Sequence, residues 1–117
     1  MSPSSLFQVC LLSEIEDPGA RGFRFGPPDR PREGFVVRRG ADAWAWLNVC
    51  PHAGRQLNWK PDAFLTKDRS LVMCSAHGAL FEPDTGLCVG GPCPGRRLTR
   101  IPCEVRDGAV LVSPEEP

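Results

Sequence analysis

Hydrophobic residues occur in short runs along the first half of the chain, and turn-forming residues separate these runs. The runs are rich in aromatic and β-branched residues and too short for ordinary helices, which is typical of β-strands. The predicted strands cover residues 6–12, 22–25, 35–39 and 43–49. Residues 27–33 hold three prolines and four charged residues, so we expect a solvated loop there, because proline has no N–H to donate to a neighbouring strand.

The C-terminal part of the chain carries a hairpin pattern. Asp107 and Gly108 lie between two apolar runs, and an Asp-Gly pair in that setting is a strong hairpin signal. The two predicted strands cover residues 97–105 and 109–113. Pro102 lies inside the first of them, so an edge position is predicted for it. One or two turns over residues 54–60 are the helical candidate, and the predicted class is all-β.

Several large or buried-type side chains are assigned to packing. Trp44 and Trp46 lie two residues apart, so they face the same side of their strand and are expected in the core. Trp59 is expected to pack the loop before it onto a sheet. Cys10 and Cys103 fall within predicted strands and are interpreted as core residues.

Length and charge exclude several classes of protein. A chain of 117 residues is about one domain, and 14 basic residues balance 14 acidic ones, which gives no indication of a nucleic-acid or membrane partner. No basic residue precedes the first apolar run, and no run approaches the roughly 18 residues of a membrane span, so no signal peptide or membrane helix is expected. The expected compartment is the cytoplasm, where six reduced cysteines indicate metal binding.

Two short stretches each place a thiol beside an imidazole. Residues 48–57 read NVCPHAGRQL, with Cys50 and His52, and residues 72–81 read VMCSAHGALF, with Cys74 and His77. These are the only histidines in the chain, and thiolate with imidazole is a ligand set for zinc, iron and copper. A zinc site usually places like ligands close together, whereas mixed pairs suit a centre with two metal ions.

The two stretches resemble the Rieske [2Fe-2S] family, whose ligand loops have the pattern C-x-H and C-x-x-H-G. The resemblance implies that Cys50 and Cys74 bind the inner iron of one [2Fe-2S] cluster, and that His52 and His77 bind the outer iron. It also implies an all-β, Rieske-type iron-sulfur fold of small antiparallel sheets. The implied organisation is a single domain over residues 1–117, with a cluster-binding subdomain over approximately 48–95 made of two ligand loops and a proline lid loop.

Glycine and proline positions fit the same resemblance. Gly54 and Gly78 would let main-chain N–H groups approach the bridging sulfides. Gly91 and Pro92 would form the lid loop, in which glycine permits the turn and proline stiffens it. Cys88 and Cys93 lie close to the lid in the sequence. They either form a disulfide or remain two buried thiols, and a reducing cytoplasm favours the thiols.

Three departures from the high-potential branch of the family indicate a low-potential Rieske ferredoxin. That branch ties its ligand loops with a disulfide, and the matching positions here are Arg55 and Ala76. It also carries a serine after the glycine of the second loop and a nearby tyrosine. Here the first position is Ala79, and the chain contains no tyrosine. Both hydroxyl donors to the cluster are therefore missing, which predicts a potential near the low end of the range, about −150 mV.

The resemblance implies a soluble one-electron carrier that accepts electrons from a reductase, such as a flavin reductase, and passes them to an oxygenase or another acceptor. A terminal oxygenase also needs an iron held by two histidines and a carboxylate, and both histidines are already used, so the chain is not expected to be an enzyme itself. Two alternatives are a small electron-transfer subunit of a larger oxidoreductase and a zinc-stabilised interaction module.

Electrons are expected to leave where the imidazole-bound iron lies nearest to solvent. The expected docking rim consists of Pro51, His52, His77, Gly78 and Pro92. Two interpretations stay open for the basic residues near that rim in the sequence, which either attract an acidic partner or form a solvated surface. These residues are Arg55, Lys60, Arg96 and Arg97.

Overall fold

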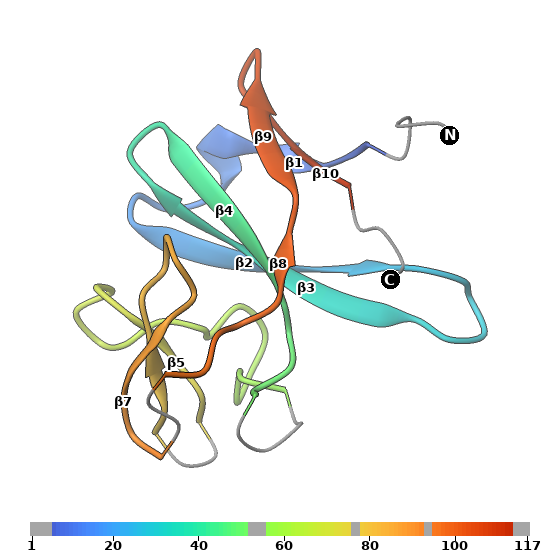
Figure 1. Cartoon of the computed structure of the whole chain (residues 1–117). Helices are drawn as coiled ribbons and strands as arrows, with labels where there is room; N and C mark the ends of the chain where they lie inside the picture. The colour runs from blue at the N-terminus through green and yellow to red at the C-terminus, as the bar shows by residue number, and fades with distance from the viewer. Residues whose placement is uncertain (1–5, 52–55, 76–77, 93–94, 114–117) are drawn as a thin grey trace.

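The chain folds into three small antiparallel β-sheets (Figure 1). The structure is a computed structural model and describes residues 6–51, 56–75, 78–92 and 95–113. The strands in these residues are β1 (Phe7–Leu11), β2 (Gly19–Phe25), β3 (Arg32–Arg39), β4 (Asp42–Leu47), β5 (Val72–Met73), β6 (Leu80–Phe81), β7 (Cys88–Gly90), β8 (Arg100–Ile101), β9 (Cys103–Arg106) and β10 (Ala109–Val112). One 3-10 turn, η1 (Leu12–Glu14), is the only helix among the described residues. The all-β class is therefore confirmed.

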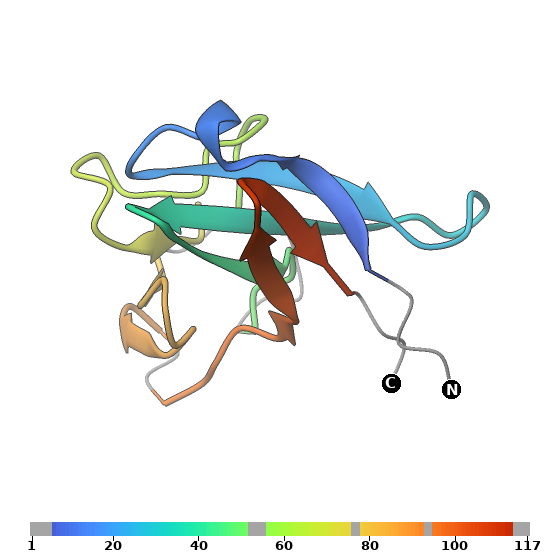
Figure 2. The same cartoon turned by 90° about the horizontal axis from the view of Figure 1, so that it is seen from above.

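The largest sheet lies between the other two. It has the strand order β2-β3-β4-β8, and the outer sheets have the orders β1-β10-β9 and β5-β6-β7. Figures 1 and 2 show the two outer sheets apart from each other, with the central sheet between them. The central sheet therefore has to bury both of its faces, and hydrophobic runs without polar interruption, such as Phe35 to Val37, meet that need.

Alternation along β3 and β4 sorts their side chains into two cores. Phe35, Val37 and Trp46 point to the side of β5 to β7, whereas Val36 and Ala45 point to the side of β1 and β10. We call the first cluster the loop core; its buried members are Phe35, Val37, Trp46, Cys50, Leu57, Phe64, Val72, Cys74, Ala79, Phe81, Cys88 and Leu98. We call the second the base core; its buried members are Cys10, Ile15, Val36, Ala45, Ile101, Val110 and Val112.

Most of the sequence-based strands are confirmed, as is the C-terminal hairpin. Arg106 pairs with Ala109 across the two-residue turn, and Asp107 and Gly108 both have positive φ angles, 54° and 79°. Positive φ at both central residues is the requirement of the tightest hairpin turn, which an Asp-Gly pair meets at little cost. Trp44 and Trp46 both contact the loop core, as their spacing predicts.

Pro102 lies between two edge strands, not inside one. β8 pairs with β4 at the edge of the central sheet, and β9 lies at the edge of the β1-β10-β9 sheet. The chain changes sheets at Pro102, whose carbonyl oxygen accepts a hydrogen bond from the Ser113 N–H at 2.9 Å. Proline has no N–H to donate to a neighbouring strand. Its position between two strands therefore leaves no main-chain donor without an acceptor.

Two predictions about residues 54–60 are wrong. The described part of this segment contains no helix, and η1 is the one helical turn in the part of the chain that the structure describes. Trp59 does not pack onto a sheet, because it is 65% exposed, with the Lys60 ammonium 4.5 Å from the centre of its ring. The fully buried Leu57 takes the packing role instead. Its N–H donates to the Asn48 side chain and its carbonyl oxygen accepts from the Ser75 N–H, and these two hydrogen bonds hold its main chain in place.

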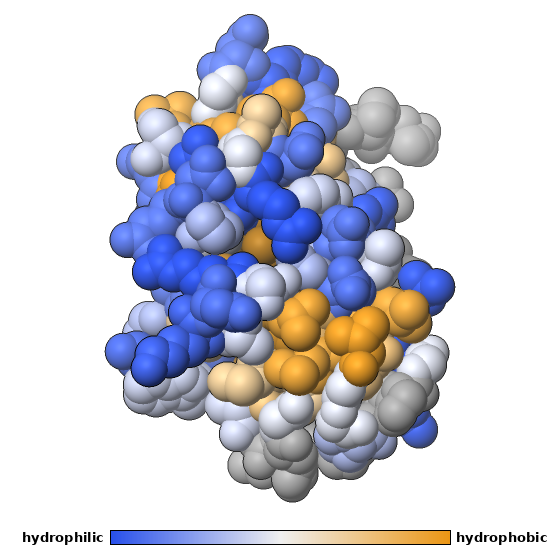
Figure 3. All heavy atoms as spheres, turned by 90° about the vertical axis from the view of Figure 1, so that its left-hand side faces the viewer, coloured by the Kyte–Doolittle hydropathy of each residue, from blue (hydrophilic) through white to orange (hydrophobic). Residues whose placement is uncertain are grey.

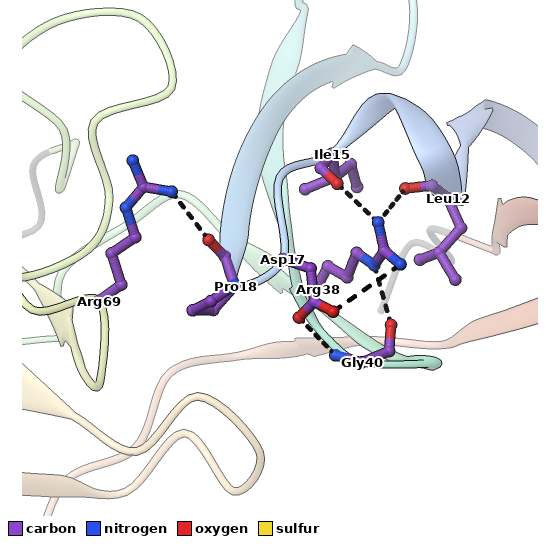
Figure 4. Close-up of polar contacts among 7 residues, drawn as sticks. All are labelled: Leu12, Ile15, Asp17, Pro18, Arg38, Gly40 and Arg69. Carbon is purple, nitrogen blue, oxygen red and sulfur yellow. Dashed lines mark hydrogen bonds and ion pairs between the residues drawn. The ribbon is translucent and has the colours of Figure 1, made fainter.

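Arg38 fastens the connection between β1 and β2 onto the turn between β3 and β4 (Figure 4). Its guanidinium donates to the carbonyl oxygens of Leu12 at 3.2 Å, Ile15 at 2.9 Å and Gly40 at 2.8 Å. The Asp17 carboxylate lies 4.0 Å from the same guanidinium and accepts from the Gly40 N–H at 2.8 Å. One half-buried arginine thus satisfies three carbonyl oxygens that no strand pairs.

In the part of the chain that the structure describes, no helix is both long and apolar enough to cross a bilayer. Figure 3 presents the left-hand side of Figure 1 and shows mostly hydrophilic residues in its upper half. A compact hydrophobic area lies in the lower half, which is the half of the molecule that contains β5 to β7. Large hydrophobic residues are exposed beside the predicted ligand loops, at Val49 and Val89, and also at β1, at Leu6, Phe7 and Leu11.

Candidate metal centre

The first predicted ligand loop begins where β4 ends, and Asn48 closes its base. The Asn48 side chain is 4% exposed, and its Oδ1 accepts a hydrogen bond from the Leu57 N–H at 2.8 Å. Its Nδ2 donates to Asn58 Oδ1 at 2.9 Å. One amide side chain therefore joins the two ends of the segment that carries Cys50, and it satisfies a buried N–H that would otherwise lack an acceptor.

The second predicted ligand loop is a tight turn between β5 and β6. The Cys74 N–H donates to the Ala79 carbonyl oxygen at 2.9 Å, and the Gly78 N–H donates to the Cys74 carbonyl oxygen at 2.9 Å. Gly78 has a φ of +73°, and an added Cβ would meet no described atom within 4 Å. Glycine is thus favoured here by the left-handed backbone conformation that the turn requires.

A main-chain hydrogen bond joins the two loops directly. The Ser75 N–H donates to the Leu57 carbonyl oxygen at 2.9 Å, so the residue after Cys74 is tied to the far end of the first loop. Cys50 and Cys74 are 0% and 1% exposed and belong to the same buried cluster, the loop core. Hydrogen bonds thus fix the two loops so that both thiols lie in one apolar environment.

The chemistry of these two thiols fits a metal centre. Sulfur is a soft ligand that binds iron or zinc as the thiolate, and burial in an apolar core excludes water from the metal. His52 and His77, with Gly54, Arg55 and Ala76, lie outside the described residues, so their side chains stay predictions. Among the described residues no cluster of three or more potential metal ligands occurs.

The predicted lid lies against the second loop. Gly91 has a φ of +82°, and a Cβ there would lie 2.7 Å from the Ala79 Cα and 2.9 Å from the Gly78 carbonyl oxygen. Glycine therefore permits both the turn, as predicted, and a close approach that no side chain allows. Pro92 follows it on the surface.

Two further contacts hold the lid segment. Arg96 Nη1 donates to the Pro51 carbonyl oxygen at 3.0 Å, which joins the far side of the lid to the first loop. The Cys88 Sγ donates to the Gly90 carbonyl oxygen at 3.1 Å, and Cys88 is 3% exposed. Cys93 lies outside the described residues, so its relation to Cys88 stays a prediction.

The two remaining cysteines lie far from these loops along the chain and belong to the base core. Cys10 is 4% exposed and Cys103 is half-buried against the same cluster, as the sequence predicts. Burial raises the pKa of both thiols, and that of Cys103 reaches about 11 although Arg100 opposes the rise. Because both cysteines pack in the base core, away from the loop core that holds Cys50 and Cys74, they have a packing role.

Comparison with known proteins identifies the family. A family model described as Rieske [2Fe-2S] domain matches residues 6–107 of the chain. The chain belongs to the Rieske [2Fe-2S] domain family. One relative of this Rieske protein is the menaquinol:cytochrome c reductase iron-sulfur subunit of Bacillus subtilis (strain 168), which is 29% identical over 119 residues. The match covers 96% of this chain and 69% of the relative.

Solved Rieske structures have the same fold. A chain in the complex of reduced oxygenase and oxidized ferredoxin in carbazole 1,9a-dioxygenase is 25% identical, with a TM-score of 0.73 over 96% of this chain and 95% of that one. The ferredoxin of carbazole 1,9a-dioxygenase from Nocardioides aromaticivorans IC177 is 23% identical. Its TM-score is 0.72 over 96% of this chain and 100% of that one. The match therefore extends over the whole architecture.

Family membership decides the cofactor. The Rieske protein carries one [2Fe-2S] cluster per chain, and the alternative of a zinc-stabilised module is set aside. The structure adds residues that the motif alone does not indicate, above all Asn48. The sequence gives only a weak indication of this role: Asn48 is a single amide residue at the point where an apolar strand ends and a loop begins.

Proposed function

We propose that Cys50 and Cys74 bind one iron of the cluster, and that His52 and His77 bind the other. The support is the spacing of the four residues, the burial of both cysteines in one core and the hydrogen bond that joins their loops. The proposed organisation is a single domain over residues 1–117, in which a cluster-binding subdomain covers approximately residues 48–95.

The proposed activity is one-electron transfer from a reductase, such as a flavin reductase, to an oxygenase. The observation that carries it is the near-complete coverage, in both directions, between this chain and a chain of the oxygenase–ferredoxin complex. When bound, a Rieske cluster takes up one electron and releases it again. Both histidines of the chain are assigned to the cluster, which leaves none for the mononuclear iron of an oxygenase and supports a carrier that is not itself an enzyme. The proposed place of action is the cytoplasm, without membrane contact.

The residues of the chain contribute burial, position and a contact surface. Cys50 and Cys74 lie away from water, and Gly91 brings the lid against the second loop. Exposed apolar residues lie next to these elements: Val49 is 41% exposed and Val89 is 48% exposed. A small apolar surface beside the centre suits short-lived contacts between redox proteins, because such contacts must form and dissociate quickly.

A second candidate function is that of an electron-transfer subunit in a larger oxidoreductase. The similarity to the menaquinol:cytochrome c reductase iron-sulfur subunit of Bacillus subtilis favours it. Against it stand Arg55 and Ala76, which occupy the positions of the disulfide cysteines, and the absence of any tyrosine. A measured potential separates the two functions: a value near about −150 mV supports the carrier, and one above about +150 mV supports the subunit.

Substitution of the cysteines tests the ligand assignment. Cys50→Ser and Cys74→Ser are expected to give colourless and poorly folded protein, because cluster binding contributes to folding free energy. Cys10→Ser is the matched control, since Cys10 is also buried but lies in the base core. Visible absorbance and iron and labile sulfide analysis are the measurements. A ligand variant with the native spectrum would overturn the assignment, as would loss of the cluster in the control alone.

A further inference from the structure

Three arginines follow the predicted lid closely in the chain, and one of them, Arg96, contacts the first predicted ligand loop. Arg96 and Arg97 are exposed and lie between β7 and β8, and the exposed Arg100 is the first residue of β8. Leu98, in the middle of this segment, is 5% exposed and belongs to the loop core. A buried leucine thus fixes the segment, while the charged residues on both sides of it face solvent. We call Arg96, Arg97 and Arg100 the arginine ridge.

Hydrogen bonds to the main chain hold each arginine of the ridge. Arg96 Nη1 donates to the Pro51 carbonyl oxygen at 3.0 Å, and Pro51 directly follows Cys50. Arg97 donates to the Thr85 carbonyl oxygen at 3.5 Å, and Arg100 donates to the Asp84 carbonyl oxygen at 3.4 Å. The Arg100 guanidinium also lies 5.4 Å from the centre of the Trp46 ring. Arg96 is therefore held at the edge of the first loop, and Arg97 and Arg100 are held against the segment between β6 and β7, so the three side chains lose less entropy on docking than free ones would.

The positive charge of the ridge has no partner within the described part of the chain. Residues 85–103 contain three arginines and no acidic residue. The four ion pairs among the described residues lie elsewhere, and they are Arg24–Glu33, Arg38–Asp17, Arg69–Glu16 and Arg106–Glu104. Arg100 contacts the main-chain oxygen of Asp84, and the two residues form no ion pair.

Arginines without ion-pair partners among the described residues make the electrostatic potential positive near the ridge, although the net charge of the protein is zero. Basic and acidic residues are equal in number, 14 each, so the excess charge at the ridge is balanced at other parts of the surface. Such an arrangement attracts an anion to one end of the molecule while the net charge stays zero. Charges at the rim of a contact raise the association rate and orient the partner more than they tighten the complex.

We propose that the arginine ridge is the docking site for an acidic face of the redox protein that exchanges electrons with this chain. The proposal rests on the proposed electron-carrier function, and it adds the charge of the partner and the residues that meet it. Its physical basis is the contact between Arg96 and the main chain next to Cys50, which places unpaired positive charge beside the first ligand loop.

Small redox reagents of opposite charge test this potential without an identified partner. The chemically reduced holoprotein is mixed in a stopped-flow instrument with ferricyanide, an anion that takes one electron from the cluster and becomes ferrocyanide. The parallel reaction uses hexaammineruthenium(III), a cation that also takes one electron. We expect the ferricyanide rate to fall about tenfold as salt rises from low to high concentration, because a screened field no longer attracts the anion. The ruthenium rate is expected to rise.

Charge-reversed variants assign the effect to the ridge. Arg96→Glu combined with Arg97→Glu should abolish or invert the salt dependence of the ferricyanide rate. The matched control is Arg30→Glu combined with Arg106→Glu, which changes the net charge equally but lies in the β2–β3 loop and at the β9–β10 turn, both away from β5 to β7 in Figure 1. The control should keep a rate that falls with salt. Arg96→Lys combined with Arg97→Lys keeps the charge and should keep the native behaviour, which separates charge from local structure.

The outcomes are distinguishable from failure of the proposed function. Protein without a [2Fe-2S] spectrum, or with a cluster that cannot be reduced and reoxidised, would contradict the electron-carrier function. In a redox-active protein, two results would overturn the ridge as a docking site but not the carrier function. One is that neither the ferricyanide rate nor the ruthenium rate depends on salt, and the other is that the control variant loses the salt dependence as fully as the ridge variant. If poly-L-glutamate at low salt slows the oxidation of the reduced protein by ferricyanide, an acidic protein partner is supported, and inhibition only by a DNA duplex overturns it.

Discussion

Gly91 offers the sharpest test of how the lid meets the second ligand loop. A Gly91→Ala substitution places a Cβ 2.7 Å from the Ala79 Cα and 2.9 Å from the Gly78 carbonyl oxygen, and both are main-chain atoms that cannot rotate away. Gly95→Ala is the matched control: Gly95 lies in the same segment with a φ of +85°, against +82° for Gly91, and its Cβ would meet no described atom within 4 Å.

The two substitutions share one energetic cost and differ in another. A left-handed backbone costs a non-glycine residue about 1–2 kcal/mol, and this applies to both variants. Overpacking against atoms that cannot move costs a further 1–3 kcal/mol or so, and this applies to Gly91→Ala alone. Since 1 kcal/mol shifts the melting temperature of a domain of this size by about 4 °C, Gly91→Ala should melt about 4–12 °C below Gly95→Ala.

The assay follows thermal loss of visible cluster absorbance and of far-ultraviolet circular dichroism at one scan rate, because unfolding with loss of a cluster is not a simple equilibrium. The visible signal should be lost at or before the backbone signal in Gly91→Ala, since the lid contacts the loop that carries Cys74. Melting temperatures within about 2 °C of each other would refute the close approach as the reason for glycine at this position.

Three further predictions concern single residues. Asn48→Ala leaves the buried Leu57 N–H without its acceptor, which costs about 1–3 kcal/mol, so hydrogen exchange in a peptide covering Leu57 should become faster. Ala79→Ser adds a hydroxyl at a fully buried position beside the second loop and should raise the reduction potential by some tens of millivolts in protein-film voltammetry, since 59 mV corresponds to about 1.4 kcal/mol for one electron. Cys103, whose pKa burial raises to about 11, should react with iodoacetamide at pH 8 about a hundredfold more slowly in the native protein than after unfolding in urea.

Each of these predictions has a contrary result. Unchanged exchange at Leu57 would show that Asn48 does not hold the first loop closed. A native potential above about +150 mV would contradict the argument from missing hydroxyl donors, whatever Ala79→Ser does. Equal labelling of Cys103 in native and unfolded protein would show that its thiol is more accessible than the base core allows.

The sequence by itself determined the local elements and the chemical class of the centre. Strand positions follow from alternation and residue type, and the Asp107-Gly108 turn follows from the backbone angles that its two residues tolerate. The spacing of two thiols and two imidazoles indicated a Rieske centre, because few cofactors require that mixture. These inferences succeed because each depends on short patterns of neighbouring residues, such as C-x-H and C-x-x-H.

The tertiary structure alone decided how distant segments meet. Pro102 marks a change of sheet, Leu57 is buried where Trp59 was expected to pack, and Asn48 joins the two ends of the first loop. The approach of Gly91 to Ala79 and the contact of Arg96 with Pro51 depend on the packing of three separate loops. No periodic pattern encodes such contacts, because the free energy that selects them comes from burial and hydrogen bonding between residues far apart in the sequence.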